Sequence, residues 1–232
     1  MTDPQPETDP QPETAPRPET GFDFVVPVAF HDLGLHLTDE ERAAHLEEIS
    51  AEIWCGGTDY QRRSTQELYG GIADAAAADG ATYAGICMVA TEDDRVSSAS
   101  LIIRSETVEP ADAETIAQTL QDVLTLDPAA DVHRTEVEAG PAVVSFVGVE
   151  WTPPGGGDAI PMAKVDVYLP LPEASSLLVM SLTTPSLPEL PDYVALLSEL
   201  AETVRLLGDD TPVRLPAQQD GESAARIASA FG

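Results

Sequence analysis

Four segments in the second half of the chain constrain the fold most, because they alternate apolar and polar residues and are joined by short connections. They read VHRTEVE, AVVSFVGVEW, AKVDVYLP and LLVMSLTT, and they are separated only around residues 140–141, 153–157 and 170–175. Strands joined by tight turns pair antiparallel, whereas parallel neighbours need a crossover of about a dozen residues or more. The second half is therefore predicted to form an antiparallel meander.

The rest of the chain adds helices and a hairpin. FDFVVPVAF predicts a short strand that ends near Pro27, and TYAGICMVA and SSASLIIR flank TEDDRV as a hairpin. Two capping boxes, which begin at Thr38 and at Ser64, predict the starts of two helices before this hairpin. A third helix is predicted over ADAETIAQTLQDVLTL, and a fourth runs from Pro191 to Gly208.

Apolar residues at helical spacing predict the buried side of each helix. In chain order the predicted stripes are Leu46, Ile49 and Ile53; Leu68, Ile72 and Ala76; Ile116, Leu120, Val123 and Leu124; and Val194, Leu197, Leu200 and Val204.

The element order β-α-α-β-β-α-β-β-β-β-α mixes helices with antiparallel hairpins, so it predicts an α+β fold rather than a doubly wound parallel sheet. We expect an antiparallel sheet of about six to seven strands with helices packed on it. Alternation in AKVDVYLP is typical of a sheet with one face covered by helices. It places Val165, Val167 and Leu169 on one face, and the other face receives Lys164, Asp166 and Tyr168.

The two ends of the chain differ in composition from the body. Residues 3–20 repeat as DPQPET, DPQPET and APRPET, which predicts a disordered, polyproline-leaning arm over residues 1–20. Residues 209–232 are expected to be an acidic linker with a short amphipathic segment, AARIASAF. A single α+β domain is expected over residues 21–208.

The charge of the chain excludes some classes of partner. Eleven Lys and Arg stand against 41 Asp and Glu, a formal net charge of −30. Such a field repels phosphate backbones and anionic lipid surfaces, so we expect no nucleic-acid partner. Neither a membrane-spanning stretch nor a signal-peptide pattern is visible, so we expect no membrane insertion and a cytoplasmic protein. A single lysine among many Ala, Pro and Asp is typical of a high-GC bacterium.

Motifs for catalysis and for metal binding are not found in the sequence. The strand-to-helix joint TTPSL lacks the glycines of a nucleophile elbow, so its hydroxyl groups are interpreted as structural. Cys55 follows a helix and Cys87 lies in an apolar strand, and both are expected to be free thiols. His45-Leu46-Glu47-Glu48 lacks the second histidine of a zinc-binding H-E-x-x-H. We therefore expect no catalytic residue, no cofactor and no metal.

Three segments, together with the element order, resemble the PsbP-like fold superfamily. The segments are FVVPVAFHDLGL, VATEDDRVSSASLIIR and LLVMSLTTPSLPELPDYVALLSELAETVRL. The superfamily includes an extrinsic photosystem II subunit, a Ran-GTPase-binding nuclear import factor and mycobacterial cell-envelope lipoproteins. The resemblance covers residues 22–207 and implies a binding or assembly role without shared catalytic residues. Two helices before the hairpin, the PPGGG connection and the lack of a lipobox cysteine depart from the family pattern and argue against an envelope-lipoprotein role.

These observations favour a non-enzymatic protein-binding or assembly-accessory protein. The predicted contact surface is the uncovered sheet face or the rim near the PPGGG tip, and the candidate contacts are Trp151, Lys164 and Arg134. The alternative is a small-molecule-binding protein or an enzyme whose pocket, between sheet and helices, is lined by His133, Asp166 and Tyr168. The identity of the partner stays open, and so does a role in secretion or immunity.

Overall fold

The computed structural model describes residues 21–152 and 156–207. The predicted arm over residues 1–20 and the predicted linker and amphipathic segment over residues 209–232 lie outside the described residues. The same holds for residues 153–155, which form most of the PPGGG connection.

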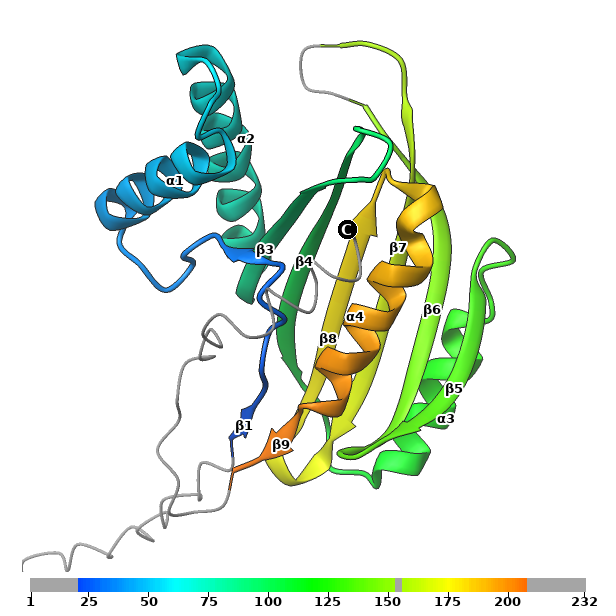
Figure 1. Ribbon diagram of the computed structural model, residues 1–232. Coiled ribbons are helices and arrows are strands. Elements are labelled where there is room, and N and C mark those ends of the chain that lie inside the picture. The colour runs from blue at the N-terminus through cyan, green and yellow to red at the C-terminus, as the bar shows by residue number, and fades with distance from the viewer. Residues whose placement is uncertain (1–20, 153–155, 208–232) are drawn as a thin grey trace, which may run out of the picture.

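A seven-stranded antiparallel sheet forms the centre of the molecule (Figure 1). Its order is β2 (His31–Asp32), β3 (Ala81–Ala90), β4 (Val96–Thr107), β8 (Ser176–Thr184), β7 (Ile160–Leu171), β6 (Gly140–Trp151) and β5 (Asp131–Val137). The last four strands of this sheet along the chain, β5 to β8, are consecutive neighbours, which confirms the predicted meander. Together with four α-helices in the described residues, the sheet confirms the predicted α+β class.

The opening segment is less regular than predicted. Only β1 (Phe22–Asp23) and β2 form strands in FDFVVPVAFHD, and β1 pairs with β9 (Arg205–Leu206) outside the main sheet. The amide of Val25 donates to the hydroxyl of Thr203 instead of to a neighbouring strand, at 2.9 Å. Pro27 has no backbone N–H group to donate a ladder hydrogen bond, so the strand does not continue through it.

The four helices are α1 (Asp39–Ile53), α2 (Asp59–Ala78), α3 (Ala113–Leu124) and α4 (Leu190–Glu202), and two short 3-10 turns, η1 (Pro172–Ala174) and η2 (Leu187–Glu189), precede β8 and α4. The capping box at Thr38 is confirmed. The predicted start of α2 at Ser64 was wrong, because Thr58 forms a capping box with Gln61 and starts the helix earlier. The predicted end of α4 at Gly208 was also wrong, since the chain turns at Thr203 to form β9.

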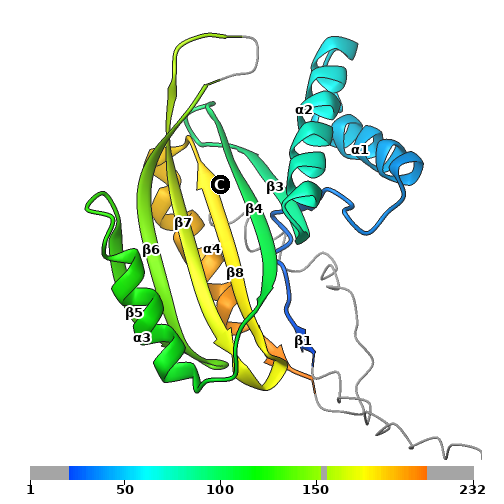
Figure 2. The same ribbon diagram turned by 180° about the vertical axis from the view of Figure 1, so that it is seen from behind.

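Helices lie on both faces of the sheet, in contrast to the predicted arrangement. Helix α4 lies across β8 and β7 on the face seen in Figure 1, where it buries the main apolar core. Helices α1 and α2 bury a second apolar cluster against the other face of β3, and α3 packs on β5, β6 and β7 (Figure 2). Between α2 and α3, no helix of the described residues lies over β8 or over most of β4 on this second face.

Two of the predicted buried stripes were partly wrong. Helix α2 buries Thr65, Tyr69, Ala73 and Ala76, and Leu68 is 48% exposed. In α3 only Ala117 is fully buried, and Val123 is 58% exposed. Helix α3 therefore covers its end of the sheet loosely.

The strand-to-helix joint uses its hydroxyl groups for structure, as predicted. Thr184 donates to the carbonyl oxygen of Ser98 at 2.7 Å and accepts from the amide of Ser186 at 2.9 Å. The hydroxyl of Ser186 in turn accepts from the amide of Ser98 at 3.0 Å. These bonds fix the end of β8 against β4, so the hydroxyl groups have partners within the fold.

Candidate functional site

The uncovered strip of sheet between α2 and α3 is the first candidate site, and we call it the open face (Figure 2). Strand registers define its residues, because directly paired residues point to the same side of a sheet. Its central row runs Ile102–Ser181–Asp166–Ser145 across four strands. The rows on either side are Ser100–Thr183–Lys164–Val147 and Arg104–Val179–Tyr168–Val143. The predicted division of β7 into an apolar face and a polar face is confirmed, since Val165, Val167 and Leu169 belong to the core under α4.

An ion pair lies at the centre of the open face. Lys164 Nζ is 2.8 Å from Asp166 Oδ2, and the side chains are 34% and 6% exposed. The hydroxyl of Tyr168 donates to the same Oδ2 over a long 3.5 Å. The other oxygen, Asp166 Oδ1, is buried and accepts no hydrogen bond from any described residue. A buried carboxylate oxygen without a donor is costly, so this position is under-satisfied in the isolated chain.

Two neighbouring groups complete the polar centre. Burial and the nearby negative charge of Asp166 raise the pKa of Tyr168 to about 12, so this hydroxyl stays a proton donor at neutral pH. Arg104 lies one strand beyond β8, and its Nε is buried without a described acceptor. The same Nε lies 3.6 Å from Glu106 Oε1, which is within ion-pair distance but too long for a hydrogen bond. Asp166 Oδ1 therefore has no hydrogen-bond donor among the described residues, whereas Arg104 Nε has Glu106 nearby, and both atoms are buried beneath the open face.

At one end the open face turns apolar. Strands β6 and β7 extend beyond their neighbours as a hairpin, and Trp151 pairs with Ile160 at its end (Figure 1). These side chains are 41% and 36% exposed. The same end of the sheet carries two further exposed apolar residues, Val96 at the start of β4 and Leu187 before α4. We call the pair formed by Trp151 and Ile160 the hairpin anchor.

The three predicted contact residues share one face of the sheet but not one patch. Alternation along β6 and β7 places Trp151 and Lys164 on the open face, one at its apolar end and the other at its polar centre. Arg134 lies on β5, on the same side, and is directed to α3, where it pairs with Glu114 and donates to Gln118. Arg134 therefore holds α3 on the sheet rather than presenting a free guanidinium group.

The residues predicted for a pocket do not meet. Asp166 and Tyr168 lie on the open face, whereas His133 pairs with Val144, whose side chain packs against the opposite, α4-covered core. His133 is exposed, and its Nε2 lies 3.0 Å from Asp131 Oδ1. The space between the sheet and α4 is filled by apolar side chains, and the hydroxyl groups of Tyr193 and Ser97 there bond to each other at 2.6 Å.

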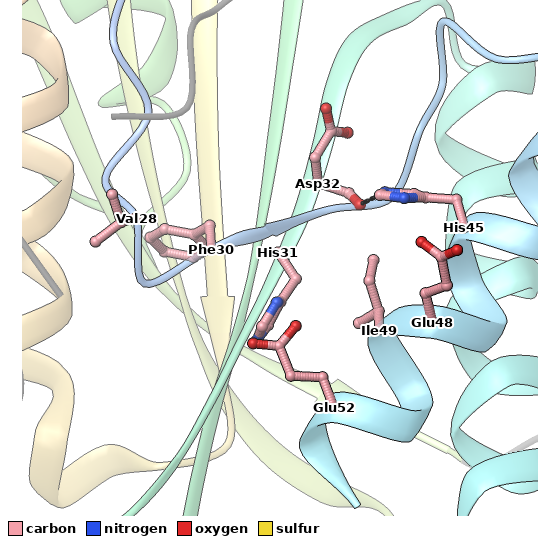
Figure 3. Close-up of a pocket in the computed structure, with 8 residues that line it drawn as sticks. All are labelled: Val28, Phe30, His31, Asp32, His45, Glu48, Ile49 and Glu52. Carbon is pink, nitrogen blue, oxygen red and sulfur yellow. Dashed lines mark hydrogen bonds between the residues drawn. The ribbon is translucent and has the colours of Figure 1, made fainter. Parts of the chain in front are cut away.

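A hollow of about 290 Å³ lies elsewhere, between β2 and α1 (Figure 3). Its apolar wall consists of Val28, Phe30 and Ile49. At this point the main core under α4, which includes Phe30, adjoins the second core, which includes Ile49. The hollow therefore lies where the two apolar cores of the molecule meet.

The polar lining of the hollow comes from two elements. Helix α1 contributes His45, Glu48 and Glu52, which lie on one side of the helix, and β2 contributes His31 and Asp32. Figure 3 shows His31 and Glu52 pointing toward each other. Burial lowers the pKa of His31, His45 lowers it further, and the charge of Glu52 opposes the shift. The Nε2 of His45 donates to the carbonyl oxygen of Asp32 at 2.8 Å, which fixes α1 against β2.

Sequence reasoning compared His45 only with the H-E-x-x-H motif, so it missed the hollow. The spacing of His45, Glu48 and Glu52 is helical and was available as a signal. The approach of His31 to these residues could not be seen in the sequence, because it depends on the pairing of β2 with β3.

Neither the thiols nor the acidic groups form a reactive or metal-binding centre in the described ranges. Cys55 is exposed and Cys87 is buried, and both are free, as predicted. Burial raises the pKa of Cys87 to about 11, which disfavours the nucleophilic thiolate. Among residues 21–152 and 156–207, no three His, Cys, Asp or Glu side chains are placed to hold a metal ion. No helix in these ranges is long and apolar enough to cross a bilayer.

Comparison with known proteins finds no family model that matches the chain, and no curated protein or solved structure that matches it.

Proposed function

We propose that the protein is a non-enzymatic binding or assembly-accessory protein that contacts a protein partner through the open face, with the hairpin anchor as its main contact. The observation that carries this proposal is the exposed pair of Trp151 and Ile160 at the end of a hairpin that extends past the rest of the sheet. Aromatic side chains dominate binding energy at protein interfaces. Covering the exposed 41% of Trp151 would bury roughly 100 Å², which stabilises a complex by about 2.5 kcal/mol.

Charge indicates the chemistry of the partner. The chain carries a formal net charge of −30, and exposed Glu150 and Asp158 flank the hairpin anchor. A partner with an apolar groove bordered by Lys and Arg would complement this end of the molecule. Acidic partners, nucleic acid included, would be repelled by the same field.

The polar centre of the open face supplies the specificity in this proposal. Lys164, whose side chain is 34% exposed, and the partly exposed Tyr168 are the groups of this centre that a partner can contact. A partner surface without an acceptor for Lys164 would remove its ammonium group from water without a replacement, which disfavours wrong partners.

The resemblance to the PsbP-like superfamily points to the same kind of function, since it implies a binding or assembly role. We keep this membership as part of the proposal. The proposed membership is supported by the order of helices and strands. It is also supported by the last elements of the domain, in which strand β8 is followed by a Ser/Thr-rich joint, prolines and helix α4.

The test is affinity purification from the native host with the full chain and two variants. In Trp151→Ala the hairpin anchor is removed, and in Tyr60→Ala an aromatic side chain that is 80% exposed on α2 is removed as the matched control. We expect a stoichiometric partner that is retained by Tyr60→Ala and bound about tenfold or more weakly by Trp151→Ala. A photo-crosslinking residue at position 160 should label the same partner, and one at position 60 should not. Equal recovery with both variants would refute the proposed surface.

A further inference from the structure

Two carboxylate groups on α1 face the hollow without a basic partner among the described residues. Glu48 and Glu52 are one turn apart on the helix, so their Cβ atoms are about 5–6 Å apart. Like charges at this spacing destabilise a helix, and no Lys or Arg side chain of the described chain lies within ion-pair distance of either. A cation bound between them would relieve this repulsion.

A neutral histidine lies opposite the two carboxylates. Burial lowers the pKa of His31, which favours its uncharged imidazole. A neutral imidazole offers one nitrogen as a hydrogen-bond acceptor. His31 therefore adds an acceptor to the hollow without adding positive charge, and it points toward Glu52 (Figure 3).

The remaining wall is apolar and the space is small. Val28, Phe30 and Ile49 line one side of the hollow, whose volume of about 290 Å³ is at the lower end of the range for ligand pockets. A short aliphatic chain fits such a wall, and the ring of Phe30 offers a face that favours a nearby cation. Bare metal ions suit the site less well, because the described residues include no set of three His, Cys, Asp or Glu ligands placed around one point.

We propose that the hollow between β2 and α1 binds a small organic cation, a primary ammonium group on a short aliphatic chain. Glu48 and Glu52 receive the ammonium group, His31 accepts one of its hydrogen bonds, and the methylene groups lie along Val28, Phe30 and Ile49. This site is separate from the open face, so a small molecule and a protein partner are not expected to compete for the same surface.

Calorimetric titration of the full chain with putrescine at physiological ionic strength tests the proposal. Putrescine should bind and raise the Tm, whereas butanediol, which has the same carbon chain without charge, should do neither. Glu52→Gln should weaken the affinity for putrescine about tenfold, since it removes one charged contact. Glu47→Gln makes the same change on an exposed position of α1 that does not line the hollow, and it should leave the affinity unchanged.

Three results would overturn the proposal. The first is the absence of putrescine binding to the wild-type chain and to the control. The second is a Glu47→Gln variant that binds as weakly as Glu52→Gln, which would mean general attraction to an acidic protein. The third is a rise in Tm with Zn²⁺ or Mg²⁺ that displaces putrescine, which would make the hollow a metal site. A parallel titration with Nα-acetyl-lysine amide separates the sources of the ammonium group: tighter binding than putrescine would assign the same chemistry to a protein lysine.

Discussion

Removal of the Lys164 cation from the open face is expected to cost more stability than removal of the Asp166 charge. Asp166 is 6% exposed and Lys164 is 34% exposed, so the two partners of one ion pair differ in their access to water. In Lys164→Met the carboxylate stays buried without its cation. In Asp166→Asn the ammonium group regains water, and the amide keeps the shape of the carboxylate.

The magnitudes follow from this asymmetry. Hydrogen bonds to charged groups contribute about 1.5–3 kcal/mol, and leaving one charge of a fully buried pair unpaired costs about 3–5 kcal/mol. Because Lys164 is one third exposed, water partly replaces it, and we expect Lys164→Met to lower the free energy of unfolding by about 2–3 kcal/mol. Asp166→Asn should cost about 1 kcal/mol, and the double variant should cost less than the sum of the two.

Urea unfolding followed by circular dichroism measures these differences. The matched control is Asp74→Asn, which makes the same substitution in an ion pair with Arg42 whose carboxylate is 71% exposed. This exposed pair should contribute no more than about 0.5 kcal/mol. A Lys164→Met variant within about 0.5 kcal/mol of the wild type, or an Asp166→Asn variant that is the less stable of the two, would refute the reasoning.

Three further predictions test other parts of the structure. Iodoacetamide should modify Cys55 alone in the native protein and also Cys87 after unfolding, as measured by mass spectrometry, because Cys87 is buried and its pKa is raised to about 11. Thr58→Ala should lower the free energy of unfolding by about 1 kcal/mol and Ser64→Ala by much less, because Thr58 caps α2; equal urea midpoints would contradict this start of the helix. Tyr193→Phe should cost about 1–2 kcal/mol in the same assay, since it removes a buried 2.6 Å hydrogen bond to a serine hydroxyl, and an unchanged midpoint would show that this bond adds nothing.

Alternation was the most reliable guide to the fold. Each residue of a strand faces the opposite side from the next, so AKVDVYLP alone predicted that Lys164, Asp166 and Tyr168 share a face. The short connections then predicted which strands are neighbours, and the structure confirms both. These predictions depend only on local geometry, which the order of residues determines.

Helix faces were harder to predict where apolar residues are small. In α2, alanines and two glycines provide little contrast between sides, and the sequence favoured Leu68 as the buried position. The structure buries the neighbouring Tyr69 instead, against Leu46 and Ile49 of α1 and Ile86 of β3. Which side of α2 is buried is therefore decided by residues of two other elements, and a single helix does not contain that information.

The open face itself results from the sides on which the connections cross the sheet. Helix α3 belongs to the connection that carries the chain from β4 to the far edge at β5, and it passes on the same side as α1 and α2 but at the other end (Figure 2). Helix α4 returns on the opposite side. With three helices divided between two ends of one face, the middle strands stay uncovered there, and β7 brings its polar residues to that strip. Helix α3 reaches as far as β7, where Asp166 is only 6% exposed, so the uncovered width of the sheet is limited to β8 and the adjoining part of β4, with the partly exposed Lys164 at its border. The position of the proposed contact surface therefore follows from the side and the end at which each connection crosses the sheet.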